Sequence, residues 1–224
     1  MTTDQKQARE LAIELALGDT RLEGDLTIPP DARGMVIFAH GSGSGRFSPR
    51  NRAVARALVE AGLATLLMDL LTEAEEAVDV TTAHLRFDIP LLAQRVIVAV
   101  DWAASADEVG ELSVGCFGAS TGAAAALIAA AERPDRVAAA VSRGGRPDLA
   151  GIALSHVTAP TLLIVGGRDT EVIRLNQQAQ ALLPGESRLE IVPGASHLFE
   201  EAGALEQVAA LASDWFLRHL GRLS

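Results

Sequence analysis

Short apolar runs alternate with longer segments of helical periodicity along most of this chain after Pro29-Pro30. The runs do not alternate strictly between apolar and polar residues, which is typical of strands buried on both faces of a sheet. These runs are Met35–Ala39, Ala64–Met68, Leu112–Phe117, Val137–Val141, Thr161–Val165 and Leu189–Val192. The helical segments are Asn51–Ala61, Pro90–Ala104, Thr121–Arg133, Val172–Leu183 and Leu205–Leu220. This order predicts an α/β fold with a mostly parallel sheet and helices on both of its faces.

The segment before Pro29-Pro30 follows a different pattern. Leu11–Leu17 and Leu22–Ile28 predict an antiparallel pair of strands joined at Gly18-Asp19.

The acidic segment Leu71–Arg86 predicts a solvated loop or a short helix, and its side chains lack the spacing of a metal site. The segment 137–160 is too short for a large lid. A length of 224 residues suits one domain, 1–224.

Composition excludes several classes of protein. A net charge of −10 argues against a nucleic-acid binder, which needs a basic face for phosphates. The single cysteine, Cys116, cannot form an internal disulfide, and we expect a packed core thiol in a cytoplasmic protein. The polar N-terminus predicts no signal peptide, and the apolar stretch Ala123–Ala131 is too short to cross a membrane. The chain lacks tyrosine, which excludes mechanisms that require a phenol.

A serine stands between a predicted strand and a predicted helix in the motif Gly118-Ala119-Ser120-Thr121-Gly122. This is the context of a nucleophile elbow, in which small residues on each side allow a tight turn and expose the hydroxyl. The Thr121 N–H would then face a developing oxyanion at the start of the helix. The alternatives are a glycine-rich connecting turn and a dinucleotide loop of the short-chain dehydrogenase kind. Those dehydrogenases need the tyrosine that this chain lacks.

An acid and a histidine follow two later strands. Asp169 ends the motif Gly166-Gly167-Arg168-Asp169, which directly follows Thr161–Val165, and a carboxylate there points into the crevice at the strands' carboxyl ends. Read alone, Asp169 would be a turn or helix-capping residue, and Glu171 and Asp148 are substitutes for it. His197 lies in a glycine-containing loop after Leu189–Val192, although a lone loop histidine is usually a surface residue. The order serine, acid, histidine along the chain is the one that a hydrolase of this architecture requires.

The loop His40-Gly41-Ser42-Gly43-Ser44-Gly45-Arg46 follows the strand Met35–Ala39. We expect it to supply a second oxyanion donor, the Ser42 N–H, with Gly41 against the substrate. A phosphate cradle is the alternative, but the loop fails both the dinucleotide and the Walker patterns. We expect His40 to brace this loop rather than to act as a base.

Six motifs give the chain a resemblance to a known family. They are FAHGSGSGR (38–46), SPRNR (48–52), GASTGAA (118–124), VSRGGRPDLAG (141–151), APTLLIVGGRD (159–169) and GASH (194–197). They resemble the α/β-hydrolase superfamily, and within it the dienelactone-hydrolase-like branch of small enzymes without a lid. Dienelactone hydrolases proper use a cysteine nucleophile, whereas this chain has Ser120. The resemblance therefore implies a general esterase or acyl hydrolase rather than a lactone hydrolase.

These observations predict a carboxylesterase-like serine hydrolase of small, short-chain esters that needs no metal or organic cofactor. Ser120 is the nucleophile, His197 the base and Asp169 the acid that orients it, with Ser42 and Thr121 as oxyanion donors. A thioesterase, amidase, perhydrolase or lactone hydrolase on the same triad, and a non-catalytic binding protein, are the alternatives. We expect neither nucleic acid nor membrane as a partner, and a homodimer is left open.

Four arginines follow predicted strands and could hold a carboxylate of the substrate: Arg46, Arg50, Arg143 and Arg146. Arg143 is the first candidate, because its strand lies beside that of the predicted elbow, and Arg46 is another. The alternative is that all four are surface residues that balance an acidic protein.

Overall fold

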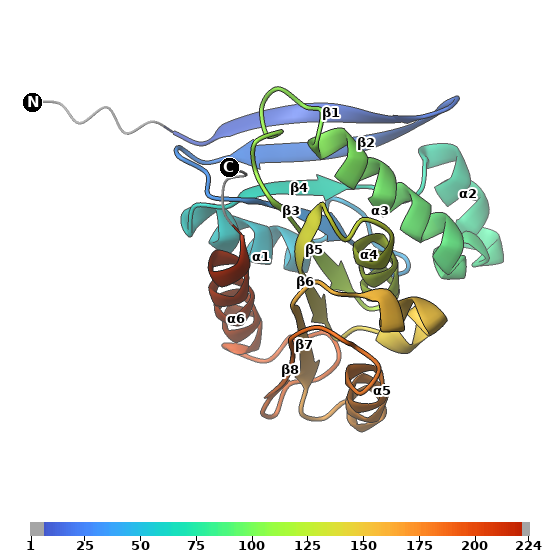
Figure 1. Cartoon of the computed structure of the whole chain (residues 1–224). Helices are drawn as coiled ribbons and strands as arrows, with labels where there is room; N and C mark the ends of the chain where they lie inside the picture. Colours follow the sequence, from blue (N-terminus) through green and yellow to red (C-terminus); the bar gives the residue numbers. More distant parts are fainter. Residues whose placement is uncertain (1–6, 221–224) are drawn as a thin grey trace, which may run out of the picture.

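A computed structural model describes residues 7–220 and places eight strands in one sheet (Figure 1). The order across the sheet is β1-β2-β4-β3-β5-β6-β7-β8. The strands are β1 (Arg9–Leu17), β2 (Thr20–Ile28), β3 (Met35–Ala39), β4 (Ala64–Met68), β5 (Val114–Ala119), β6 (Val137–Arg143), β7 (Thr161–Gly166) and β8 (Ser187–Val192). β1, β2 and β4 pair antiparallel, and every pair from β4 through β3 to β8 is parallel. The predicted architecture, with its N-terminal antiparallel pair, is thus confirmed.

Helices cover both faces of this sheet and divide the core in two (Figure 1). On one face, α1 (Pro49–Glu60) and α6 (Ala204–His219) pack together over the sheet. On the other face lie α3 (Ile89–Ala103), α4 (Thr121–Glu132) and α5 (Thr170–Gln180). All residues of the central strands β3, β4, β5 and β7 are buried, as their continuous apolar runs predict.

β5 ends two residues later than its apolar run indicates. The run predicts a strand over Leu112–Phe117, whereas the strand is Val114–Ala119. Gly118 pairs with Ala39 of β3, and Ala119 pairs with Arg143 of β6, so small residues extend the ladder beyond the last large apolar side chain. The residue that follows, Ser120, consequently lies at the very end of a central strand.

The acidic segment after β4 folds into a short helix with its own cap. The hydroxyl of Thr72 accepts the N–H of Glu75, while the Glu75 carboxylate accepts the N–H of Thr72, which is a capping box. The helix α2 (Glu73–Thr82) then leads into the 3-10 turn η1 (Leu85–Phe87). This helix overlies the loop that follows β3 and therefore borders the predicted site.

The connection from β6 to β7 consists of 3-10 turns, η2 (Pro147–His156), in place of a large lid. They pack against α4 and α5 at one face of the sheet. Within residues 7–220, none of the helices has both the length and the apolar character needed to cross a bilayer.

Candidate active site

Ser120 occupies a strained turn between β5 and α4. Its backbone angles, φ 50° and ψ −121°, lie in a region that residues with a side chain rarely adopt. The turn is closed by two glycines that have no room for a side chain. A Cβ on Gly118 would lie 2.3 Å from the Ala123 Cα, and one on Gly122 would lie 2.3 Å from the Ala39 carbonyl oxygen. These features are those of a nucleophile elbow.

Asp169 and His197 are in direct contact. Asp169 follows β7 and precedes α5, and His197 lies in the loop between β8 and α6. The Nδ1 atom of His197 is 2.6 Å from Oδ2 of Asp169. A carboxylate can only accept, so Nδ1 carries the proton and Nε2 is left as the acceptor.

The substitutes for Asp169 are engaged elsewhere. Glu171 pairs with Arg174 one turn along α5, and this hydrogen bond lowers the pKa of the Glu171 carboxyl. Asp148 accepts two hydrogen bonds from Arg146, at 2.7 and 2.8 Å. Asp169 is thus the carboxylate that the fold brings to the histidine.

Ser120 and His197 border two consecutive residues at the end of β6, Arg143 and Gly144. The N–H of Ser120 donates to the Arg143 carbonyl at 3.3 Å. A Cβ on the next residue, Gly144, would lie 3.0 Å from the His197 carbonyl oxygen and 3.6 Å from its Nδ1. Gly144 has φ 51°, so the chain turns sharply there and leaves room for the histidine loop. The predicted nucleophile and base therefore lie on one rim of the sheet.

The loop after β3 lies against the predicted nucleophile, Ser120. A Cβ on Gly41 would be 3.0 Å from the Ser120 Cβ, which explains the glycine at this position. The Nε2 atom of His40 accepts the Leu70 N–H at 3.0 Å, so its Nδ1 carries the proton and donates to the Gly41 carbonyl at 2.9 Å. Burial lowers the pKa of His40 and keeps its ring neutral. His40 thus braces the loop, as predicted, and oxyanion donation by Ser42 and Thr121 stays a prediction.

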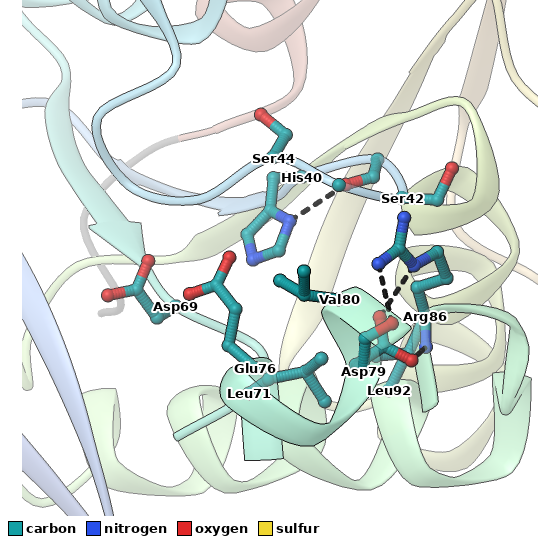
Figure 2. A pocket seen from close by; sticks show the side chains of 12 residues that line it. His40, Ser42, Ser44, Asp69, Leu71, Glu76, Asp79, Val80, Arg86 and Leu92 are labelled. Atoms are coloured by element: carbon teal, nitrogen blue, oxygen red, sulfur yellow. Dashed lines mark hydrogen bonds and ion pairs between the residues drawn. The ribbon is translucent and has the colours of Figure 1, made fainter. Parts of the chain in front are cut away.

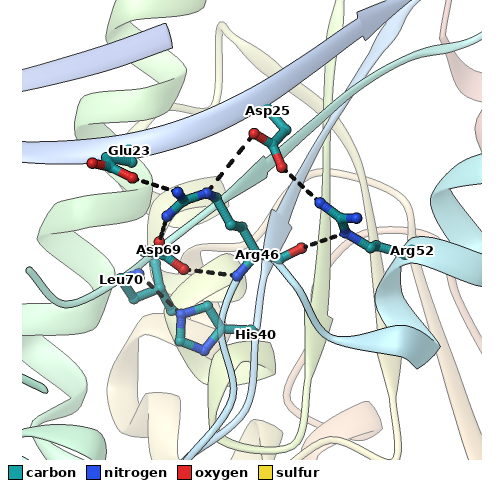
Figure 3. A network of polar contacts seen from close by, with 7 residues as sticks. All are labelled: Glu23, Asp25, His40, Arg46, Arg52, Asp69 and Leu70. Atoms are coloured by element: carbon teal, nitrogen blue, oxygen red, sulfur yellow. Dashed lines mark hydrogen bonds and ion pairs between the residues drawn. The ribbon is translucent and has the colours of Figure 1, made fainter. Parts of the chain in front are cut away.

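Arg46 is bound by the protein's own carboxylates (Figure 3). Its guanidinium forms ion pairs with Asp69, Glu23 and Asp25. The backbone N–H of Arg46 also donates to Asp69 Oδ1 at 2.7 Å. These bonds tie the loop after β3 to β2 and to the end of β4. We therefore assign Arg46 a structural role, and its expected contact with a substrate stays a prediction.

Arg143, by contrast, is buried without a carboxylate partner among residues 7–220. It is 8% exposed, its Nη1 has no hydrogen-bond partner, and its guanidinium lies 5.9 Å from the centre of the Phe117 ring. Burial lowers the pKa of Arg143 to about 10, and the positive charge of Arg50 adds to this shift. An unpaired buried cation is costly for a folded protein, and here it lies beside the predicted nucleophile.

A cavity of about 260 Å³ adjoins the loop after β3 (Figure 2). Leu71, Val80 and Leu92 form its apolar wall, while the loop with Ser42 and the side chain of Glu76 form its polar rim. Arg86 reaches into this rim from η1 and donates to Asp79 at 2.6 Å. Sequence patterns do not indicate the cavity, because part of its wall belongs to α2, a segment whose acidic residues are typical of a solvated surface.

Two further predictions concern Cys116 and metal binding. Cys116 is fully buried in β5, and burial raises the pKa of its thiol to about 12, so it is the predicted core thiol. Within the described part of the chain, no group of three or more His, Cys, Asp or Glu side chains is arranged to hold a metal ion.

Sheet, elbow and the acid–histidine pair together define an α/β hydrolase, and comparison with known proteins makes this more specific. The model of the dienelactone hydrolase family matches residues 22–220. The chain belongs to the dienelactone hydrolase family.

The relatives are consistent with this assignment. A dienelactone hydrolase from Anabaena variabilis, known from its crystal structure, has 59% sequence identity to this chain. The two structures match with a TM-score of 0.94, over 96% of this chain and 99% of that one. A Pyrococcus furiosus esterase shares the fold, with a TM-score of 0.73 at 17% identity over 96% of this chain and 92% of its own.

A protein of Mycobacterium tuberculosis described as a candidate phosphoribosyl transferase is 57% identical over 212 residues, or 95% of this chain. The chain spans about half the length of that relative, 47%. Its name describes a much longer protein and carries no assignment for this chain.

Proposed function

We propose that this chain is a serine hydrolase of small esters, with Ser120, His197 and Asp169 as its catalytic triad. The observation that carries the proposal is the 2.6 Å contact between His197 Nδ1 and Asp169 Oδ2, made at the rim where Ser120 stands in a strained elbow. A histidine held in this tautomer keeps Nε2 free to act as a base for a serine hydroxyl.

The mechanism follows from these roles. The Oγ atom of Ser120 attacks the ester carbonyl while His197 takes its proton, and Asp169 stabilises the imidazolium that forms. The N–H groups of Ser42 and Thr121 stabilise the oxyanion, and each is expected to lower the barrier by about 3 kcal/mol. His197 then protonates the leaving alcohol, and water attacks the acyl-enzyme by the same steps to release the acid.

We take the cavity beside Ser42 as the acyl-binding site, because Gly41 both lines it and lies against Ser120. At about 260 Å³ it is slightly below the range of about 300–1,000 Å³ that is usual for ligand pockets. Its apolar wall of Leu71, Val80 and Leu92 suits a short alkyl group. We therefore expect turnover of chromogenic esters to fall as the acyl chain lengthens beyond a few carbons.

A panel of matched substrates tests the reaction class. p-Nitrophenyl esters of increasing acyl length would be compared with a thioester and an anilide of the same acyl group, together with labelling by a fluorophosphonate probe. Ester turnover above that of the other two, with the label on Ser120, supports the proposal. Faster turnover of the thioester or the anilide would reassign the enzyme, and the absence of both turnover and labelling would favour a non-catalytic binding protein.

Arg143 suggests that the ester carries an anionic group. Its buried guanidinium has Phe117 at one side and no carboxylate partner in the described part of the chain. The nearby Arg50 reaches Glu200 only at 3.5 Å, so this flank of the site retains positive charge. A carboxylate on the substrate would pair with it.

Replacing Arg143 by methionine separates this role from a structural one. We expect kcat/KM for p-nitrophenyl hemisuccinate to fall by about tenfold or more relative to the neutral butyrate, because a charged hydrogen bond is lost. The free energy of unfolding should stay the same or rise, because an unpaired buried charge is removed. Arg52→Met, an exposed arginine paired with Asp25, is the control. Equal losses on both esters would remove Arg143 from the proposal.

A further inference from the structure

The loop that carries Asp169 and the loop that carries His197 are joined by their backbones. The N–H of Gly167 donates to the Val192 carbonyl at 2.8 Å, and the N–H of Arg168 donates to the Ala195 carbonyl at 2.9 Å. A Cβ on Gly166 would lie 2.4 Å from the Ser196 carbonyl oxygen, so only glycine allows the two loops to approach this closely. The acid and the base therefore depend on how these loops are held together.

One side chain, Glu201, spans the residues that precede the acid and the histidine. Its Oε2 atom accepts the N–H of Ser196 at 2.9 Å and the Ser196 hydroxyl at 3.3 Å. Its Oε1 atom forms an ion pair with Arg168. Ser196 stands immediately before His197, and Arg168 stands immediately before Asp169. Glu201 thus contacts the chain one residue away from each member of the pair.

These bonds keep Glu201 charged. The N–H of Ser196 is the largest cause of a lowered pKa of about 2 for its carboxyl, and the charge of Arg168 adds to the shift. The carboxylate consequently stays ionised throughout the pH range in which a histidine can act as a base.

The loop that Glu201 holds is strained. Phe199, between His197 and Glu201, has φ 56° although it is not glycine, and its ring is buried. A residue in this region persists only where its surroundings fix it. The exposed ion pair of Arg133 with Asp101, by contrast, links the end of α4 to α3 and involves no residue beside the site.

We propose that Glu201 is a positioning residue, which fixes the hydrogen bond between Asp169 and His197 through Arg168 and Ser196. The proposal rests on the function proposed above, and it extends that function to a residue that touches neither the substrate nor the reacting atoms. Its effect belongs to kcat rather than to KM, because misplacing a base slows the chemical step without changing how the substrate binds.

Variants at Glu201 and Arg168 test the proposal. Glu201→Ala removes both contacts, whereas Glu201→Gln keeps an acceptor for Ser196 and loses the charge that faces Arg168. We expect kcat to fall by about tenfold in Glu201→Ala and less in Glu201→Gln, with KM within about twofold of wild type. Adding Arg168→Met to Glu201→Ala should cost little more, because both changes break the same link.

A spectroscopic measurement keeps the test independent of turnover. The Nδ1–H proton of His197, bonded to Asp169, should give a far-downfield NMR resonance that is absent in Asp169→Asn. We expect this resonance to broaden or vanish in Glu201→Ala and to persist in Asp101→Asn, the control that loses an exposed ion pair far from the site. Thermal unfolding of each variant shows that the folded protein is being compared.

The outcomes are distinct. An unchanged resonance and kcat in Glu201→Ala would overturn the positioning role, and so would equal losses in Asp101→Asn. If the wild-type protein neither hydrolyses esters nor labels with the fluorophosphonate, the proposed function fails. The resonance then decides the role of Glu201 by itself: its loss in Glu201→Ala supports the link, and its retention overturns it.

Discussion

Replacing Ser120 by alanine is expected to lower kcat for a short p-nitrophenyl ester by about 10⁴-fold or more, with little change in KM. The alanine methyl group fits the elbow but provides no nucleophile, so only binding and oxyanion stabilisation remain. Asp169→Asn is expected to cost on the order of 10³–10⁴-fold, because an amide can hold the imidazole in the wrong tautomer. Steady-state kinetics, with thermal unfolding as a check on folding, measure both effects.

A second serine serves as the control. Ser155→Ala changes a hydroxyl that bonds only within η2, to the Ile152 carbonyl at 2.8 Å and to the neighbouring His156 ring. It should hydrolyse the ester at the wild-type rate. If Ser120→Ala retained a tenth of the wild-type rate or more, Ser120 would not be the nucleophile. If Asp169→Asn were fully active, Asp169 would not be the orienting acid.

Replacing Gly122 by alanine is expected to destabilise the protein by about 3 kcal/mol or more. The added Cβ would lie 2.3 Å from the Ala39 carbonyl oxygen and 2.4 Å from that of His40. Both oxygens belong to the backbone at the end of β3, so neither can turn aside as a flexible side chain would. The elbow and the loop after β3 would have to separate, and hydrolysis should be lost together with stability. Urea unfolding measures the first effect and ester turnover the second.

Gly62 provides the comparison, because glycine is needed there for the backbone conformation and not for lack of room for a side chain. It has φ +88°, and a Cβ added to it would meet no atom within 4 Å, so Gly62→Ala should cost only about 1–2 kcal/mol. A Gly122→Ala protein as stable as Gly62→Ala would show that the elbow can relax. The close approach of α4 to β3 would then not explain the glycine.

The fold was largely predictable from the sequence, because central parallel strands bury both faces and leave a continuous apolar signature. Strand ends were less predictable. β5 extends through Gly118 and Ala119, where pairing with β3 and β6 replaces hydrophobicity as the cause of strand structure. The pair Asp169–His197 was predictable because each residue follows a strand whose carboxyl end lies at the same rim.

Residues that act through long-range pairing were not predictable in the same way. Arg46 carries a positive charge in a glycine-rich loop, and nothing in that pattern indicates that Asp69, Glu23 and Asp25 converge on it. Glu201 is one of two adjacent glutamates in the loop before α6, and only the folded chain brings Arg168 to it. The cavity beside Ser42 depends on how α2 settles over the loop after β3, which is a matter of packing between elements.

The order of the sheet has a consequence for when such an enzyme could first act. Ser120 follows β5, but its proposed acid and base follow β7 and β8, which come later in the chain than every other strand of the sheet. A nascent or truncated chain that ends after β6 therefore holds a serine with no partner to activate it. With the proposed triad, catalytic competence requires that β7 and β8 have docked, so turnover would report on completion of the whole sheet.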